Sequence, residues 1–83
     1  MTRELRILVV DDDFRVAALH ASVVDSMLGL VTVGSARTIA EARTMLADAD
    51  AAQAPVDLAL VDVYLPDGSG IDLVRGLRCD AFI

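Results

Sequence analysis

Short apolar runs alternate with segments of helical spacing along the whole 83-residue chain. Three runs are rich in β-branched residues and are typical of buried strands: Leu5–Val10, residues 30–33 and residues 56–63. Each is followed by a segment whose apolar residues recur every three or four positions: residues 14–28, 39–49 and 71–78. Residues 80–83 look like the opening of a fourth strand. This alternation predicts right-handed crossovers and a parallel sheet with helices on both faces.

Polar residues mark where each predicted helix begins. Asp13 and Ser69 suit the position before the first turn, where a side-chain oxygen accepts a backbone N–H. Thr38 and Glu41 form a capping box at the start of the second helix. Within the first helix we expect Ala17, Ala21, Val24 and Leu28 to share one buried face. We also expect Gly34 and Ser35 to end the second strand, and Asp67 to serve as a turn residue.

Composition excludes several classes of function. The chain is 55% hydrophobic and 24% charged, which favours a packed domain over disorder. Its net charge of −6 disfavours nucleic-acid binding by this segment. One cysteine, Cys79, cannot form an internal disulfide, and no apolar stretch is long enough to cross a membrane. The start of the chain has no signal-peptide pattern, so we expect a cytoplasmic protein.

Three aspartates follow apolar strands. Asp11 and Asp12 end the first strand, and Asp62 lies near the end of the third. Ligands bind beyond the carboxyl ends of the strands in sheets of this kind. If the two strands are neighbours, the carboxylates converge and repel one another, by roughly 4 kcal/mol for two charges about 4 Å apart at an effective dielectric of about 20. Mg²⁺ would relieve that repulsion, because it prefers oxygen ligands and binds phosphate. An aspartate beside such a metal can accept a phosphoryl group covalently.

Two segments carry a family resemblance. Residues 7–13, ILVVDDD, resemble the first strand and acidic corner of response-regulator receiver domains. Residues 58–70, LALVDVYLPDGSG, resemble their phosphoacceptor strand and loop, with Pro66 four places and Gly70 eight places after Asp62. The resemblance covers essentially the whole chain. The motifs around Asp12 and Asp62 also resemble the citrate and dicarboxylate-sensing subgroup.

The resemblance implies a fold and a set of residue roles. The fold would be a flavodoxin-like, doubly wound parallel sheet with residues 1–83 forming one partial receiver domain. Asp62 would accept the phosphoryl group from a sensor histidine kinase and help to hold Mg²⁺. Asp12 would bind the ion directly, Asp11 would act mainly through a coordinated water, and the backbone carbonyl of Tyr64 would complete the ligands. Such a domain is a signalling module that catalyses only its own phosphotransfer.

The chain departs from the family pattern in one respect. Receiver domains also use a Ser or Thr after the fourth strand and a Lys after the fifth, whereas this chain ends earlier and contains no lysine. The resemblance therefore implies truncation after the third helix. In the expected strand order the third strand would become an open edge, and we expect self-association there. A full-length parent would carry a DNA-binding output domain.

Two other functions compete with the receiver. A Mg²⁺-dependent phosphatase with an aspartyl-phosphate intermediate has a similar layout, but it usually carries a second acid two places after the nucleophile, where this chain has Tyr64. A truncated, inactive interaction fragment is the second alternative. His20, the only histidine, is expected to lie on a helix surface and not to donate a phosphoryl group.

Overall fold

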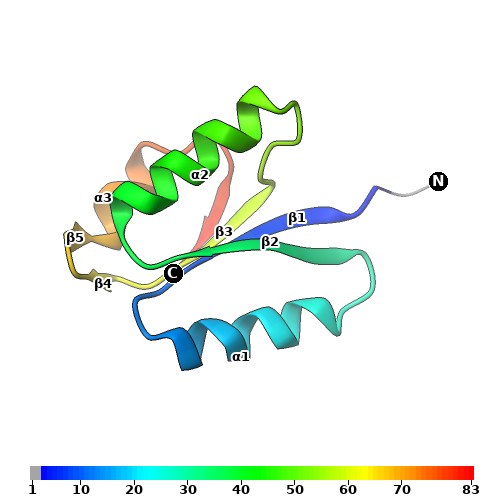
Figure 1. The fold of residues 1–83 in the computed structure, drawn as a ribbon, viewed down its shortest axis with the longest axis horizontal. Coiled ribbons are helices and arrows are strands. Elements are labelled where there is room, and N and C mark those ends of the chain that lie inside the picture. The colour runs from blue at the N-terminus through cyan, green and yellow to red at the C-terminus, as the bar shows by residue number, and fades with distance from the viewer. Residues whose placement is uncertain (1–2) are drawn as a thin grey trace.

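The computed structural model describes residues 3–83, which form a parallel sheet with helices on both faces (Figure 1). The strands are β1 (Leu5–Val10), β2 (Leu30–Ala36), β3 (Leu58–Val61), β4 (Tyr64–Leu65), β5 (Gly68–Ser69) and β6 (Asp80–Phe82). The helices are α1 (Phe14–Asp25), α2 (Ile39–Ala51) and α3 (Gly70–Arg75).

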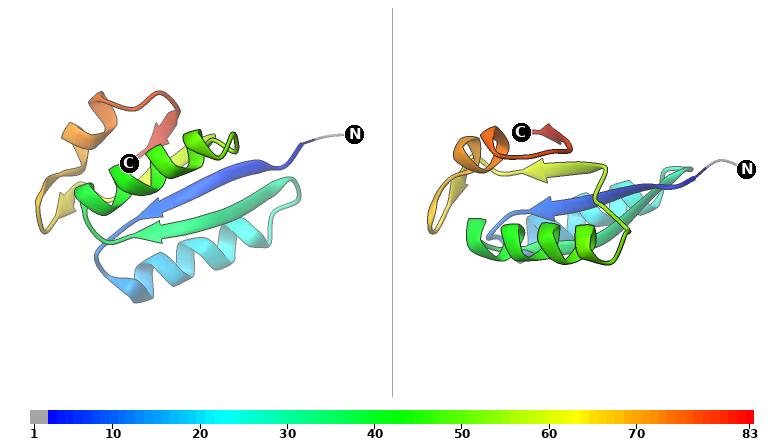
Figure 2. Two further views of the ribbon diagram at one scale, coloured as in Figure 1. Left: turned by 45° about the horizontal axis from the view of Figure 1, so that its top comes forward. Right: turned by 90° about the horizontal axis from the view of Figure 1, so that it is seen from above.

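The main sheet has the strand order β2-β1-β3-β6, and all three pairings are parallel. Strand β1 is therefore central, and its last residue, Val10, pairs with Val61 at the end of β3. The carboxyl ends of the two strands meet at one edge of the sheet (Figure 2). The predicted doubly wound α/β fold is confirmed, including the short fourth strand, which is β6.

The core lies mainly between the sheet and the helices α2 and α3. Ten buried residues form one cluster there: Leu8, Val10, Ala36, Ile39, Ala42, Val56, Ala59, Val61, Leu65 and Leu73. Helix α1 covers part of the opposite face and buries Ala17 and Val24 (Figure 1). Beside α1 a groove of about 840 Å³ runs from the carboxyl ends of β1 and β3 to the exposed Phe82 and Ile83.

Helix α1 is shorter than its apolar spacing predicts. It ends at Asp25, because the Ser26 hydroxyl donates a hydrogen bond to the Val23 carbonyl and the chain then turns through Gly29 with φ of +87°. The expected buried face is confirmed at Ala17 and Val24, but Leu28 lies beyond the helix and is fully exposed.

Strand β2 is longer than predicted, and the idea that Gly34 and Ser35 end it is wrong. Both residues stay in register with β1, with a local irregularity between Ile7 and Leu8. A Cβ on Gly34 would collide with the terminal methyl of Met45. The glycine therefore makes room for the packing of α2 on the sheet and does not break the strand.

Strand β3 is shorter than predicted, and its surroundings differ from expectation. Directly after Asp62 the chain folds into a two-rung antiparallel hairpin, β4–β5, which the sequence pattern did not predict. The expectation that β3 forms the open edge also needs correction. Leu58 to Leu60 pair with Asp80 to Phe82, so β6 is the edge strand.

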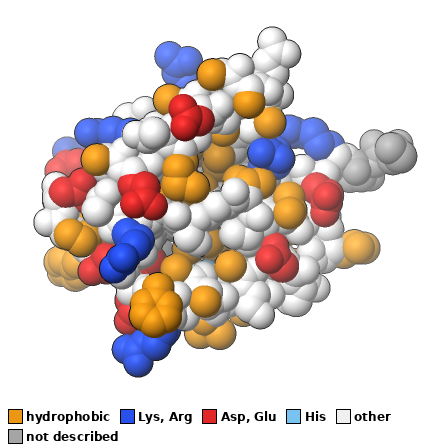
Figure 3. Space-filling model, in the orientation of Figure 1, with side chains coloured by type: hydrophobic (Ala, Val, Ile, Leu, Met, Phe, Trp, Pro, Cys, Tyr) orange, Lys and Arg blue, Asp and Glu red, His pale blue; other side chains and the backbone are white. Residues whose placement is uncertain are grey.

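The surface seen in Figure 3 mixes acidic, arginine and hydrophobic side chains. No helix among residues 3–83 has the length and hydropathy needed to cross a membrane.

Candidate phosphoacceptor site

Asp11 and Asp12 leave the end of the central strand. The backbone N–H of Asp11 still donates to the carbonyl of Ala36 on β2 at 2.9 Å, so the sheet ladder holds Asp11 in place. The Asp11 side chain is buried, with 7% of the residue exposed, and one of its carboxylate oxygens accepts a hydrogen bond from the Asp13 N–H at 2.9 Å. Asp12 is exposed. One carboxylate is thus fixed while its neighbour stays open to solvent.

Asp62 follows the neighbouring strand in the equivalent position. Its backbone N–H donates to the carbonyl of Val10 at 2.9 Å, which extends the pairing of β1 with β3 by one hydrogen bond. Its half-buried carboxylate accepts a hydrogen bond from the N–H of Tyr64 at 3.3 Å. That single contact leaves carboxylate lone pairs available for a ligand.

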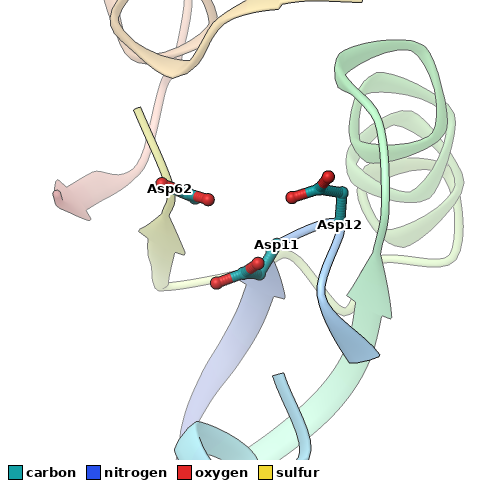
Figure 4. Close-up of side chains that lie close together, drawn as sticks. All are labelled: Asp11, Asp12 and Asp62. Atoms are coloured by element: carbon teal, nitrogen blue, oxygen red, sulfur yellow. The ribbon is translucent and has the colours of Figure 1, made fainter. Parts of the chain in front are cut away.

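The three carboxylates form one cluster at the edge of the sheet (Figure 4). Asp11, Asp12 and Asp62 each offer an oxygen, and these oxygens all lie within 4.8 Å of one another. An all-oxygen donor set from two or three carboxylates, open to solvent on one side, fits Mg²⁺ with bound water and phosphate. The residues present therefore fit the ion that the sequence pattern implies.

Residues 63–70, here called the acceptor loop, are closed at the base by a backbone hydrogen bond. The N–H of Gly70 donates to the carbonyl of Val63 at 2.7 Å, while Tyr64 pairs with Ser69 across the hairpin. Tyr64 is 84% exposed. Its backbone carbonyl, which the sequence resemblance assigns to the metal, belongs to this tightly turned segment.

Asp13 lies beside the cluster but has another task. Its carboxylate accepts hydrogen bonds from the N–H groups of Arg15 and Val16 at 2.9 and 3.4 Å, so it caps α1 as predicted. The hydrogen bond from Arg15, chiefly, holds the pKa of Asp13 below its ordinary value. His20 is exposed on α1, as expected for a helix-surface residue.

Two acidic residues outside the cluster do more than the sequence indicates. Asp67, predicted only as a turn residue, accepts hydrogen bonds from the first two N–H groups of α2. Asp57 accepts the Arg6 N–H at 2.7 Å and pairs with Arg3 at 2.6 Å. Both contacts join segments more than 25 residues apart, so no local pattern could have revealed them.

The family model for the response regulator receiver domain matches residues 7–81, which is nearly all of the chain. The chain belongs to the response-regulator receiver family. The predicted family membership is confirmed, and with it a place in two-component signalling.

The chain is similar to several curated bacterial regulators. It is 36% identical over 78 residues to the transcriptional regulatory protein CitT of Halalkalibacterium halodurans, covering 94% of this chain and 33% of the relative. It is 34% identical to the transcriptional regulatory protein DcuR of Shigella flexneri, covering 89% of this chain and 30% of that protein. For DpiA of Escherichia coli the identity is 35%, over 93% of this chain and 32% of the relative.

Solved receiver structures show the same fold. The MaeR response regulator bound to beryllium trifluoride superposes with a TM-score of 0.79 at 32% identity, covering 94% of this chain and 64% of that chain. A MaeR mutant bound to sulfate gives a TM-score of 0.80 at 30% identity, over 95% of this chain and 65% of that one. The receiver fold of residues 3–83 is thus confirmed. The chain spans about a third of the curated relatives and slightly under two thirds of these structures.

Proposed function

We propose that this receiver domain accepts a phosphoryl group on Asp62 while Asp11 and Asp12 help to hold Mg²⁺ beside it. The observation that carries the proposal is the convergence of three carboxylate oxygens within 4.8 Å, at the carboxyl ends of adjacent parallel strands. A domain keeps three such charges together at a cost in repulsion, which a bound cation offsets.

Each residue has a distinct part in this proposal. Asp12, which is exposed, would bind the ion directly, and buried Asp11 would act mainly through a coordinated water. The Asp62 carboxylate and the backbone carbonyl of Tyr64 would complete the protein ligands. When bound, Mg²⁺ neutralises charge on the incoming phosphoryl oxygens.

The covalent step is an exchange of bonds at phosphorus. A free carboxylate oxygen of Asp62 forms the new O–P bond, and the N–P bond to the donor imidazole breaks. The imidazole keeps the electron pair and takes up a proton from solvent. Asp62 is suited to this attack, because its carboxylate accepts only one hydrogen bond among the residues described and lies half-buried at the carboxyl end of β3.

Phosphorylation by a small donor tests the proposal directly. Incubation with phosphoramidate or acetyl phosphate and Mg²⁺ should add one phosphoryl mass to the intact protein, and hydroxylamine should remove it, as expected for an acyl phosphate. EDTA or the substitution Asp62→Asn should abolish the adduct. Asp57→Asn is a matched control, because Asp57 lies at the opposite end of β3 and should not affect the adduct.

The same assay separates the alternatives. Steady turnover of a phosphoester such as p-nitrophenyl phosphate, without a lasting adduct, would favour a Mg²⁺-dependent phosphatase. No adduct with any donor would favour an inactive interaction fragment and would refute the phosphoacceptor proposal.

The proposal extends to the localisation, the partners and the subgroup of this protein. We infer that this protein is cytoplasmic and that a sensor histidine kinase is its phosphodonor. We also infer a DNA-binding output domain in a full-length parent, since the similar proteins CitT and DcuR are transcriptional regulators. This segment itself would not touch DNA, since its net charge is −6. The similarity to these regulators also supports the citrate and dicarboxylate-sensing subgroup.

A further inference from the structure

The tip of the β4–β5 hairpin is attached to the first turn of α2. One carboxylate oxygen of Asp67 accepts the N–H of Ile39 at 2.8 Å, and the other accepts the N–H of Ala40 at 3.0 Å. The residues are 28 and 27 positions apart in the chain. Asp67 therefore makes a long-range, bidentate connection between the acceptor loop and a helix.

This connection supplements an ordinary local cap. The Thr38 hydroxyl oxygen accepts the N–H of Glu41 at 3.0 Å, which confirms one of the two hydrogen bonds of the predicted capping box. Among residues 3–83 the Thr38 N–H makes no return bond to the Glu41 carboxylate. The first N–H groups of a helix have no partner within the helix, and the positive end of the helix dipole favours an anion there. The hydrogen bond from Ile39, followed by that from Ala40, lowers the pKa of Asp67. Asp67 is thus held as a carboxylate at the start of α2.

Apolar packing brings the hairpin tip close to the same helix. Leu65 is buried in the core cluster that contains Ile39. A Cβ on Gly68 would lie 3.0 Å from the terminal methyl of Ile39, and Gly68 has φ of +149°. The positive φ favours glycine, and the hairpin backbone lies close enough to α2 for the Asp67 carboxylate to reach the helix N-terminus.

The base of the hairpin is fixed to the acidic cluster. Tyr64 donates its N–H to the carboxylate of Asp62, and Gly70 donates its N–H to Val63. Two rungs, Tyr64 with Ser69 and Leu65 with Gly68, join base to tip. Movement of the tip away from α2 would therefore be transmitted over a short hairpin to the backbone of Tyr64.

The other end of the connection also returns to the cluster. Helix α2 begins shortly after Ala36 of β2, whose carbonyl accepts the N–H of Asp11. The Asp67 contact thus closes a ring of connected segments. The ring runs from Asp11 through β2 and the start of α2 to the hairpin, and then through Asp62 back to β1. Apart from that contact, no hydrogen bond among residues 3–83 joins the hairpin to α2.

We propose that Asp67 is a positioning residue, which sets the acceptor loop, and with it the backbone of Tyr64, against the acidic cluster. This inference rests on the proposed function, because an effect of Asp67 on metal binding requires the Tyr64 carbonyl to be a metal ligand. Loss of partners outside the ligand shell commonly weakens metal binding by about 10-fold to 100-fold. We expect Asp67→Ala to weaken Mg²⁺ binding by about tenfold.

Thr38→Ala provides the matched control. Both substitutions remove hydrogen bonds from the first turn of α2, and both should lower Tm, but only Asp67→Ala releases the hairpin. Amide hydrogen exchange at Tyr64 and Gly70, measured without metal, should accelerate in Asp67→Ala and stay unchanged in Thr38→Ala. Fluorescence of Tyr64, the only tyrosine in a chain without tryptophan, follows Mg²⁺ titration in each variant. Asp67→Asn keeps one acceptor oxygen and should recover part of the Mg²⁺ affinity.

Each outcome decides the inference. Faster exchange and weaker Mg²⁺ binding in Asp67→Ala alone would support it. Equal effects of Asp67→Ala and Thr38→Ala, or unchanged exchange at Tyr64 and Gly70, would overturn it, as would unfolding of both Asp67 variants. If the unsubstituted protein does not bind Mg²⁺, the proposed function fails, while the exchange comparison still decides whether Asp67 positions the loop.

Discussion

Gly70 presses directly against the backbone of Asp62: a Cβ at Gly70 would overlap the Asp62 carbonyl oxygen and crowd the side chain of Val61. The glycine eight places after the acceptor is therefore a requirement of packing. It allows the start of α3 to lie against the end of β3, which closes the acceptor loop.

Gly70→Ala should destabilise the domain, because the Asp62 backbone must move to admit a methyl group. Overpacking of this kind costs about 1–3 kcal/mol. Urea denaturation followed by circular dichroism would measure it. Gly76→Ala is the matched control, since the nearest atom to a Cβ there lies 3.8 Å away and φ is −98°. Equal stability of the Gly70 variant and the unsubstituted protein would show that the loop adjusts freely.

Asp12→Asn should change stability in opposite directions with and without metal. Removing one of three mutually repelling charges should stabilise the metal-free protein by about 0.2–1 kcal/mol, the usual scale for exposed charge pairs. Mg²⁺ at ten times its Kd should stabilise the unsubstituted protein by about 1.4 kcal/mol, and this gain should shrink in the variant. Thermal melts with Mg²⁺ or EDTA would test both effects. Asp13→Asn, which alters only the cap of α1, should keep the Mg²⁺ response.

The Tm of the domain should be lower at acid pH than at neutral pH, and protonation of Asp57 should contribute to the difference. The hydrogen bond from the Arg6 N–H, and then that from Arg3, lower the pKa of Asp57 in the folded state. A lowered folded pKa stabilises the protein above the ordinary aspartate value of about 3.9, and this contribution is lost as the pH falls below it. Tm should therefore decline below about pH 4.

Two variants identify the cause of that decline. Asp57→Asn should flatten the acid limb of a plot of Tm against pH. Arg3→Gln should flatten it less, because the backbone donor Arg6 is the larger influence on the pKa of Asp57. A greater effect of Arg3→Gln would contradict this ranking.

Strand β6 should mediate self-association. It pairs with β3 on one side, and its other edge is open among residues 3–83, with Phe82 69% and Ile83 52% exposed. Unpaired edges with apolar side chains invite pairing with a second copy, whereas lysine on an edge opposes it. Phe82→Lys should reduce association in sedimentation equilibrium. Phe14→Lys, at an equally exposed phenylalanine on α1, should not. A strictly monomeric unsubstituted protein at high concentration would refute the expectation.

Prediction from the sequence succeeded where the signal was local or periodic. Strand β1 has the bounds expected from its apolar run, and Asp13, Thr38 and Ser69 cap the helices as their side chains suggested. It failed where a neighbour in space overrode the local tendency. Gly34 continues a strand because it pairs with Leu8 of β1. Leu28 is exposed for a local reason, because α1 ends before reaching it.

The order of apolar runs, helical segments and strand-end aspartates was enough to define the parallel α/β fold and to nominate Asp11, Asp12 and Asp62. These properties depend on spacing along the chain, which backbone periodicity converts directly into faces and edges. Only the tertiary structure decided that β6 forms the edge strand, that the loop after Asp62 is a hairpin, and that Asp67 accepts hydrogen bonds from the first turn of α2. The edge strand and the Asp67 contact depend on groups far apart in sequence, whose meeting is settled by packing and by the need of buried or terminal backbone groups for partners. The hairpin is local, but its tip is held by that same contact with α2.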